Sequence, residues 1–256
     1  MTHIWWAFGL LIVINHSIGY PRGVKNFERN PEELGGFFEG DMDLSDEQFL
    51  ELRSRNGYIS KTRRWPNKLV YYKISPDFDP PHKYHILRAI QILEEATCLR
   101  FKEASAEDKY YINITGASSG CHSQVGYRKK VQRMNLQIHP LDKGCFRMGS
   151  ILHELLHTLG FFHQQSASDR NSYIKVIEEN IIPGMEENFR QQTDTENFGI
   201  SYDYDSVLHY SSMAFSVNGE KTIETLDPNA VIGQRKGLST KDIDKLNTMY
   251  LCPIQT

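Results

Sequence analysis

The feature that most constrains this chain is the run HELLHTLGFFH, from His153 to His163. On an α-helix, residues four apart lie on one face, so His153 and His157 would project side by side and could bind one zinc ion. Gly160 can adopt the left-handed conformation that ends helices, which would let the chain turn and bring His163 to the same ion. Three protein ligands leave one position open, as in catalytic zinc sites, whereas structural sites are usually closed by four. The run therefore predicts one Zn2+ per chain.

Glu154 is the residue that could do chemistry at such a site. It lies one position after His153, about 100° further round a helix, so it can face water on the metal without being a ligand. Zinc would lower the pKa of that water to about 7 and polarise a carbonyl group, and Glu154 could take the water's proton. A buried helix that carries HExxH by chance is the alternative, but the third histidine and the glycine favour the metal.

Composition places the chain among ordinary soluble proteins. Its 256 residues, 39% of them hydrophobic and 24% charged, are enough for one sizeable core or for two lobes around a cleft. The net charge of −3 offers no basic face of the kind that nucleic-acid binding requires. We therefore expect no nucleic-acid partner, and we expect a monomer.

The N-terminus predicts export. Residues 4–14, IWWAFGLLIVI, form an apolar run that is shorter than the about 20 residues needed to span a bilayer. Ser17 and Gly19 follow at the spacing that signal peptidase prefers, so we interpret residues 1–19 as a secretory signal. An N-terminal anchor or a buried strand is the alternative. Removal of the signal would leave a secreted chain without a membrane segment.

The cysteines agree with an oxidising compartment. Cys98, Cys121, Cys145 and Cys252 are even in number and follow the signal, which predicts two disulfides, although the residues alone allow three pairings. Asn113 begins the triplet NIT, a candidate glycosylation site of a kind that also arises often by chance.

Residues 20–55 are interpreted as a propeptide. The segment is polar, rich in charge and glycine, and contains no cysteine. It ends in LRSR, where Arg53 and Arg55 form a basic site that suits an activating protease cutting at Arg55. A solvated loop with some arginines is the alternative. Processing there would leave residues 56–256 as the mature domain.

The pattern of that domain predicts mixed secondary structure. Strands are expected from their β-branched and aromatic content or their alternation at 68–74, 110–115 and 134–140, and Pro140 makes the last of these resemble an edge strand. Helices are expected from their apolar spacing at 82–98 and 148–160. A final helix should follow Ser239, which can serve as its N-cap, with Asp242 at the third position.

Several motifs together resemble one known family. The run HELLHTLGFFHQQSASDRN (153–171) is similar to the extended signature of the astacin metallopeptidases, a branch of the metzincins. Four shorter motifs resemble the family's propeptide motif, first cysteine segment, Met-turn and C-terminus: FEGD (38–41), CLRF (98–101), SVLHY (206–210) and YLC (250–252). The resemblance implies an α+β, two-lobed metzincin-like zinc peptidase domain. Its N-terminal lobe would hold a twisted mixed sheet and two long helices, and its C-terminal lobe would be mostly irregular with a terminal helix.

The resemblance also implies roles for individual residues. The three histidines of the signature would bind zinc, and Glu154 would be the general base. Tyr210 would be a fifth zinc ligand at rest that swings away to stabilise the oxyanion, a role that suits a phenol because it can both ligate and donate a hydrogen bond. Asp41 would occupy the water position on zinc in the zymogen. Residues 134–138 would form the edge strand that receives a protein or peptide substrate. The implied disulfides are Cys98–Cys252 and Cys121–Cys145.

The chain departs from the family pattern at positions around the site. Gln164 replaces a glutamate that usually pairs with the new N-terminal ammonium, and an amide cannot form that ion pair. Ala167 and Asn171 replace an arginine and an aspartate in the tail of the signature. Leu208 replaces the methionine beneath the zinc at similar volume, and Met213 lies too far along the chain to take its place.

Two functions are compatible with these residues. The first is a secreted zinc-dependent endopeptidase, made as a zymogen with an aspartate switch. The alternative is a catalytically weak or dead relative that binds peptides or partners through the same cleft. The presence of Glu154 and Tyr210 favours the enzyme.

Overall fold

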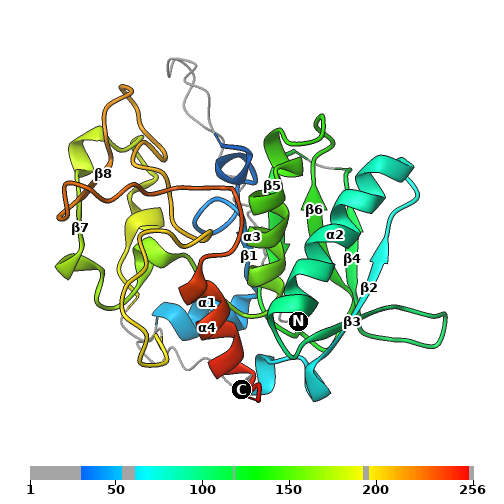
Figure 1. The fold of residues 1–256 in the computed structure, drawn as a ribbon. Helices are drawn as coiled ribbons and strands as arrows, with labels where there is room; N and C mark the ends of the chain where they lie inside the picture. The colour runs from blue at the N-terminus through cyan, green and yellow to red at the C-terminus, as the bar shows by residue number, and fades with distance from the viewer. Residues whose placement is uncertain (1–29, 54–60, 118, 193–195, 254–256) are drawn as a thin grey trace, which may run out of the picture.

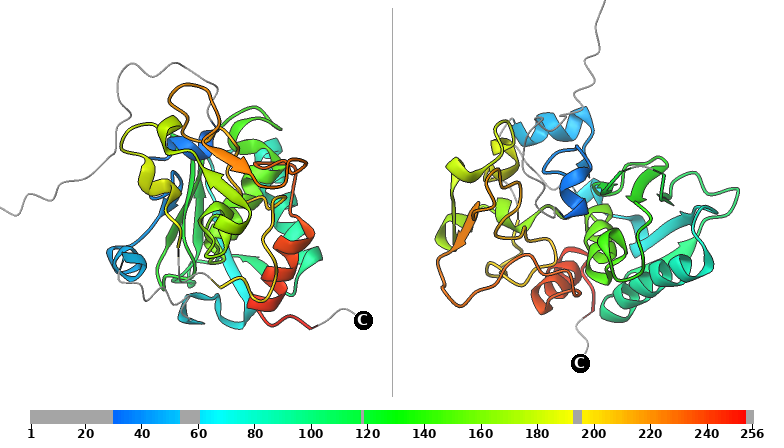
Figure 2. Two further views of the ribbon diagram at one scale, coloured as in Figure 1. Left: turned by 90° about the vertical axis from the view of Figure 1, so that its left-hand side faces the viewer. Right: turned by 90° about the horizontal axis from the view of Figure 1, so that it is seen from above.

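The computed structural model describes residues 30–53, 61–117, 119–192 and 196–253. They form two lobes side by side, with the segment 30–53 lying between them (Figures 1 and 2). The interpreted signal at 1–19 and the basic site at Arg55 lie outside the described residues. Among the described helices, none is long and apolar enough to cross a membrane.

One lobe is built on a six-stranded sheet with the strand order β1-β5-β6-β4-β2-β3. Its strands are β1 (Met42–Asp43), β2 (Leu69–Ile74), β3 (Arg100–Glu103), β4 (Ile112–Thr115), β5 (Cys121–Gln124) and β6 (Gln132–Leu136). Neighbouring strands are parallel except for β5 and β6, which are antiparallel. This is the mixed sheet that the resemblance implied, and β2 and β4 confirm two of the strands expected from their composition.

The expectation that residues 134–138 form an edge strand is wrong. They overlap β6, which pairs with β4 on one side and β5 on the other. The alternation of apolar and polar residues identified the strand but not its neighbours, because an interior position can also bury its polar members. Asn135 is fully buried and donates from Nδ2 to the Gly120 carbonyl at 2.7 Å. The strand next to the sheet's outer edge on this side is β5, which is covered by β1.

Two helices cover one face of the sheet (Figure 1). They are α2 (Pro80–Ala96) and α3 (Met148–Thr158). Asp79 caps α2 by accepting from the His82 N–H at 2.9 Å, and the two prolines that follow it suit the first turn, where no N–H bond is required. The α2 residues buried against the sheet recur at helical spacing: Ile86, Ala89, Ile90 and Leu93. Both expected helices are therefore confirmed.

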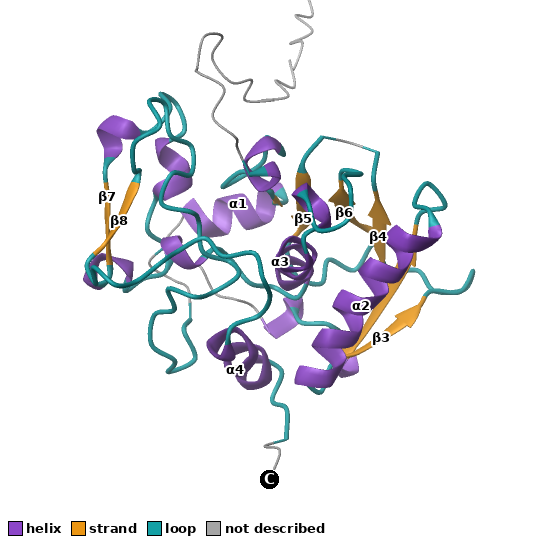
Figure 3. Ribbon diagram, turned by 45° about the horizontal axis from the view of Figure 1, so that its top comes forward, coloured by secondary structure: helices purple, strands orange, loops and turns teal. Residues whose placement is uncertain are grey.

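The second lobe is mostly loops (Figure 3). It contains β7 (Ile174–Val176) and β8 (Ile223–Thr225), which pair in an antiparallel fashion and were not expected. Helix α4 (Thr240–Met249) follows Ser239, and Ser239 and Asp242 form the reciprocal bonds of a capping box. The remaining α-helix of the described residues, α1 (Asp46–Arg53), belongs to the segment 30–53.

Two disulfides join distant parts of the chain. Cys98 before β3 pairs with Cys252 after α4, and Cys121 of β5 pairs with Cys145 just before α3. These are the pairs that the resemblance implied. The second bond joins β5 to the segment just before α3, the helix that carries His153 and His157.

Close packing at the start of α3 generates a first prediction. A Cβ added at Gly149 would lie 2.1 Å from the backbone carbon of Arg235, which joins the second lobe to α3. Gly149→Ala should therefore lower the free energy of unfolding by about 2 kcal/mol, as overpacked sites do. Urea unfolding measures this change. Gly237→Ala is the control, because a Cβ there meets no atom within 4 Å; an equal loss in both variants would contradict the steric explanation.

Candidate metal centre

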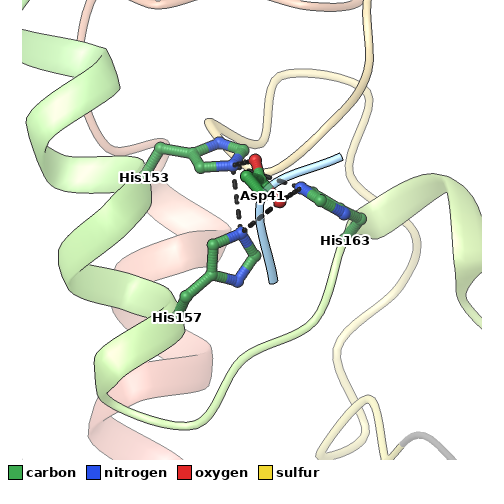
Figure 4. Close-up of side chains that lie close together, drawn as sticks. All are labelled: Asp41, His153, His157 and His163. Atoms are coloured by element: carbon green, nitrogen blue, oxygen red, sulfur yellow. Dashed lines mark hydrogen bonds and ion pairs between the residues drawn. The ribbon is translucent and has the colours of Figure 1, made fainter. Parts of the chain in front are cut away.

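Helix α3 and the turn after it bring three histidines together. His153 and His157 lie one helical turn apart on α3, and both are fully buried. The helix gives way to Gly160, whose φ of +109° is open to glycine but not to other residues without strain. The chain reverses there and returns His163, which is 2% exposed, to the same point (Figure 4). The helix-ending glycine predicted from the sequence therefore performs that role.

Backbone carbonyls orient the two α3 rings. Nδ1 of His153 lies 2.8 Å from the Val207 carbonyl, and Nδ1 of His157 lies 2.7 Å from the Phe161 carbonyl. A carbonyl oxygen can only accept, so each Nδ1 carries the proton and each Nε2 presents a lone pair. Burial also lowers the pKa of both rings well below its usual value, which keeps them neutral.

The three Nε2 atoms converge, and this geometry suits a bound cation. Nε2 of His153 lies 3.0 Å from that of His157 and 3.2 Å from that of His163. Two buried lone pairs at such a distance repel each other unless a proton or a metal ion lies between them. Asp41 completes the group: its Oδ2 is 3.0 Å from His153 Nε2 and its Oδ1 is 3.2 Å from His163 Nε2 (Figure 4). Oδ1 is buried without a hydrogen-bond donor among the described residues, as expected for an oxygen reserved for a metal.

Electrostatics at the centre favour positive charge. Burial alone would lower the pKa of His163, but the adjacent carboxylates of Asp41 and Glu39 outweigh it and raise that pKa to about 9. A donor set of three imidazoles and one carboxylate is one that zinc takes readily. The residues therefore fit a zinc ion.

A tight turn delivers Asp41 to the histidines. Phe37 and Gly40 exchange two backbone hydrogen bonds, 3.2 Å and 3.0 Å long, so the chain reverses within FEGD. Gly40 has φ +92°, and a Cβ there would meet the Glu32 carbonyl at 2.7 Å. After the turn, β1 pairs with β5 through Met42 and Asp43. Asp41 is thus placed by a turn whose last residue, Gly40, has a backbone conformation and close packing that favour glycine.

A second acidic anchor holds the same segment. Glu32 is 4% exposed and lies between two arginines from distant parts of the chain, with Arg235 Nε at 3.1 Å and Arg147 Nη2 at 3.2 Å. Ser150 Oγ donates to it at 2.6 Å. Burial alone would raise the pKa of Glu32, but the two guanidinium groups lower it below its usual value. This anchor could not be predicted, because nothing in the sequence indicates which of many acidic residues meets an arginine pair.

Glu154 lies beside the centre without belonging to it. Its side chain is fully buried, and Oε2 accepts from Ser123 Oγ of β5 at 2.5 Å. Oε1 has no hydrogen-bond partner among the described residues. Burial, together with the negative charge of Asp41, raises the pKa of Glu154 well above its usual value. A carboxylate with one oxygen held and the other open is suited to exchange a proton with water.

Tyr210 is engaged by the segment 30–53. Its ring centroid lies 4.9 Å from that of His163, and its hydroxyl donates to the Glu39 carbonyl at 2.5 Å. Leu208, where the resemblance implied a substituted methionine, is 4% exposed, whereas Met213 is 47% exposed and does not pack there. The tyrosine is therefore near the centre, but a backbone carbonyl holds its hydroxyl.

The other residues that depart from the family pattern contact neighbouring side chains. The amide oxygen of Gln164 accepts from the Lys245 ammonium, which is 9% exposed. Ala167 packs against the apolar cluster of the second lobe. Asn171 accepts from Arg170 Nε at 2.9 Å and donates to Gln191. Gln164 is thus paired with a cation of helix α4.

Comparisons with known proteins agree with this geometry. A family model described as Astacin, a peptidase family, matches residues 57–251. Seminal metalloprotease 1 of Drosophila melanogaster is 44% identical over 232 residues, which are 88% of this chain and 90% of that protein. Zinc metalloproteinase nas-7 of Caenorhabditis elegans is 36% identical over 88% of this chain, but the match spans only 56% of the nas-7 protein.

A solved structure shows the same fold. High choriolytic enzyme 1, a hatching enzyme zinc-protease from the medaka fish Oryzias latipes, superposes with a TM-score of 0.70 at 35% identity. The match covers 76% of this chain and 97% of that one.

Removing one imidazole should remove the metal. His157→Phe leaves two histidines and an apolar ring at the centre, so zinc per chain, measured by atomic absorption after dialysis, should fall from one ion to nearly none. His122→Phe is the matched control, because His122 is also buried but lies outside the cluster. Zinc retained at one ion per chain in His157→Phe would contradict the assigned ligands.

Proposed function

Because this chain belongs to the astacin family of zinc metallopeptidases, and is therefore a peptide hydrolase, we propose that it is a secreted endopeptidase made as a zymogen with an aspartate switch. The observation that carries the proposal is the position of Asp41. Its carboxylate lies among three converging Nε2 atoms and comes from outside the segment that matches the family.

The proposed mechanism assigns distinct tasks to the residues of the centre. His153, His157 and His163 would hold the zinc ion, which when bound supplies a Lewis acid that activates water and a peptide carbonyl. Glu154 would accept the proton of the attacking water at Oε1 and pass it to the leaving nitrogen, while Ser123 holds Oε2 in place. Tyr210, once free of the Glu39 carbonyl, would donate its phenolic proton to the oxygen on which negative charge develops.

The substrate would bind along β5. In the present structure β1 adds to that strand in a parallel register, with Met42 opposite Ser123 and Asp43 opposite Gln124. Removal of residues 30–53 would make β5 the edge of the sheet and open its backbone groups to an extended peptide. The strand also carries Ser123, the partner of Glu154, so a peptide bound there passes the general base.

The unprocessed chain would be kept inactive by several separate contacts of the segment 30–53. Asp41 takes the place of water at the centre, β1 fills the peptide-binding edge, and Glu32 is held by Arg147 and Arg235. Processing at Arg55 by an activating protease would release all of them together, because they lie on one continuous segment.

The paired cysteines support export of the chain from the cell. The two disulfides require an oxidising compartment. We include in the proposal the signal at 1–19, the propeptide at 20–55, the mature domain at 56–256 acting as a monomer, and a glycan on Asn113. That side chain is half-buried within β4, so its glycosylation stays a prediction.

Replacement of the general base tests the mechanism. Glu154→Gln in the processed protein should lower kcat/KM for a quenched peptide by about 10²- to 10⁴-fold, the usual contribution of a general base, while zinc stays near one ion per chain. A zinc chelator should abolish the activity of the parent enzyme. No turnover in the zinc-loaded parent would instead favour a protein that only binds peptides, and turnover that survives the chelator would contradict the zinc mechanism.

Replacement of the switch residue tests the zymogen. Asp41→Ala should give the unprocessed chain part of the activity of the processed enzyme, because water can then reach the position that the carboxylate fills. The unprocessed parent should be silent. Asp46→Ala is the control, since Asp46 lies in the same segment but is exposed, and it should leave the chain silent. An inactive Asp41→Ala chain that becomes active on processing would argue against an aspartate switch.

A further inference from the structure

The three imidazoles are not oriented by the same part of the chain. The two rings on α3 donate from Nδ1 to carbonyls of the domain that matches the family. The third ring, His163, has its Nδ1 2.9 Å from Oε2 of Glu39, a carboxylate of the segment 30–53. One ligand of the centre is therefore oriented by residues that the proposed processing removes.

The negative charge of Glu39 is compensated by hydrogen bonds to both oxygens of its carboxylate. Its side chain is fully buried, and its other oxygen, Oε1, accepts from Ser166 Oγ at 2.7 Å and from Gln192 Nε2 at 3.5 Å. A buried carboxylate is costly unless it is paired and hydrogen-bonded, and here every described donor comes from the second lobe. The residue also has φ +48°, a left-handed conformation that is uncommon outside glycine and that marks a site where function outweighs backbone strain.

We propose that Glu39 is a positioning residue for the metal, whose carboxylate orients His163 and tightens zinc binding in the unprocessed chain until processing withdraws it. The inference rests on the proposed function, because it presumes that residues 30–53 leave on activation. The turn FEGD then carries two carboxylates with different tasks. Asp41 would face the ion, and Glu39 contacts Nδ1 of His163, on the side of the ring opposite the ion.

The physical basis is the effect of a carboxylate on an imidazole that donates to it. Accepting the Nδ1 proton fixes the ring and its tautomer and makes Nε2 a stronger electron donor toward a cation. Partners of this kind typically contribute 10- to 100-fold in metal affinity. The two backbone carbonyls behind the α3 rings remain after processing, whereas the carboxylate behind His163 does not. The processed enzyme should therefore hold zinc less tightly than the loss of Asp41 alone explains.

The test measures zinc affinity rather than activity. The unprocessed full chain is prepared in a Glu154→Gln background, so that it cannot cut itself, and its zinc dissociation constant is measured by competition with a chelator of known affinity. Glu39→Ala should weaken zinc binding by about 10- to 100-fold. Glu39→Gln should weaken it less, because the amide oxygen still accepts from Nδ1 but carries no charge.

Glu32→Gln is the matched control. It loosens an equally buried anchor of the same segment without contacting His163, so it should leave the zinc dissociation constant within about twofold. Substitution of Co2+ for zinc gives a second readout: its visible absorption bands should shift in Glu39→Gln and not in Glu32→Gln. Equal affinities in the parent and Glu39→Ala would overturn the inference, and so would an equal weakening by Glu32→Gln, which would assign the effect to docking of the segment. Failure of the parent chain to bind zinc would overturn the proposed function as well.

Discussion

The structure depends on three imidazole rings whose Nε2 atoms converge in a buried centre. Each Nε2 lies within about 3 Å of another, and their repulsion in a buried site is relieved by a cation between them. The groups around the three rings favour a cation at this point. Carbonyls behind the α3 rings fix the protons on Nδ1, and the carboxylate of Asp41 supplies negative charge toward the same point.

This requirement explains why the two lobes meet where they do. Helix α3 is buried from Gly149 to Thr158, so its packing sets the positions of two histidines against the sheet. The third ligand comes from the turn after Gly160, where the chain enters the second lobe. The lobes are thus joined by the ligand set, while Arg235 packs against Gly149 at the start of α3.

The segment 30–53 uses the same features that a substrate would use. Its strand adds to β5, its aspartate reaches the centre, and its carbonyl at Glu39 receives the Tyr210 hydroxyl. In the proposed zymogen, this segment would inhibit by occupying each element of the site at once, without a separate docking surface. Its hold would come from many modest contacts, which would be lost together once the cleaved segment departs.

The sequence by itself determined which histidines converge at the centre, because four-residue spacing on a helix and a glycine that ends it are local properties. The histidines, Glu154, the two helices of the first lobe and the N-cap at Ser239 all follow from spacing or propensity within a few residues. Local patterns could not determine which strands are neighbours, so the prediction that residues 134–138 form an edge strand is wrong: they overlap β6, which lies inside the sheet between β5 and β4. For the same reason only the tertiary structure decided the partners of Glu32, Glu39 and Gln164. These contacts join residues separated by 80 or more positions, and a single sequence does not record which distant charges meet when the chain is compact.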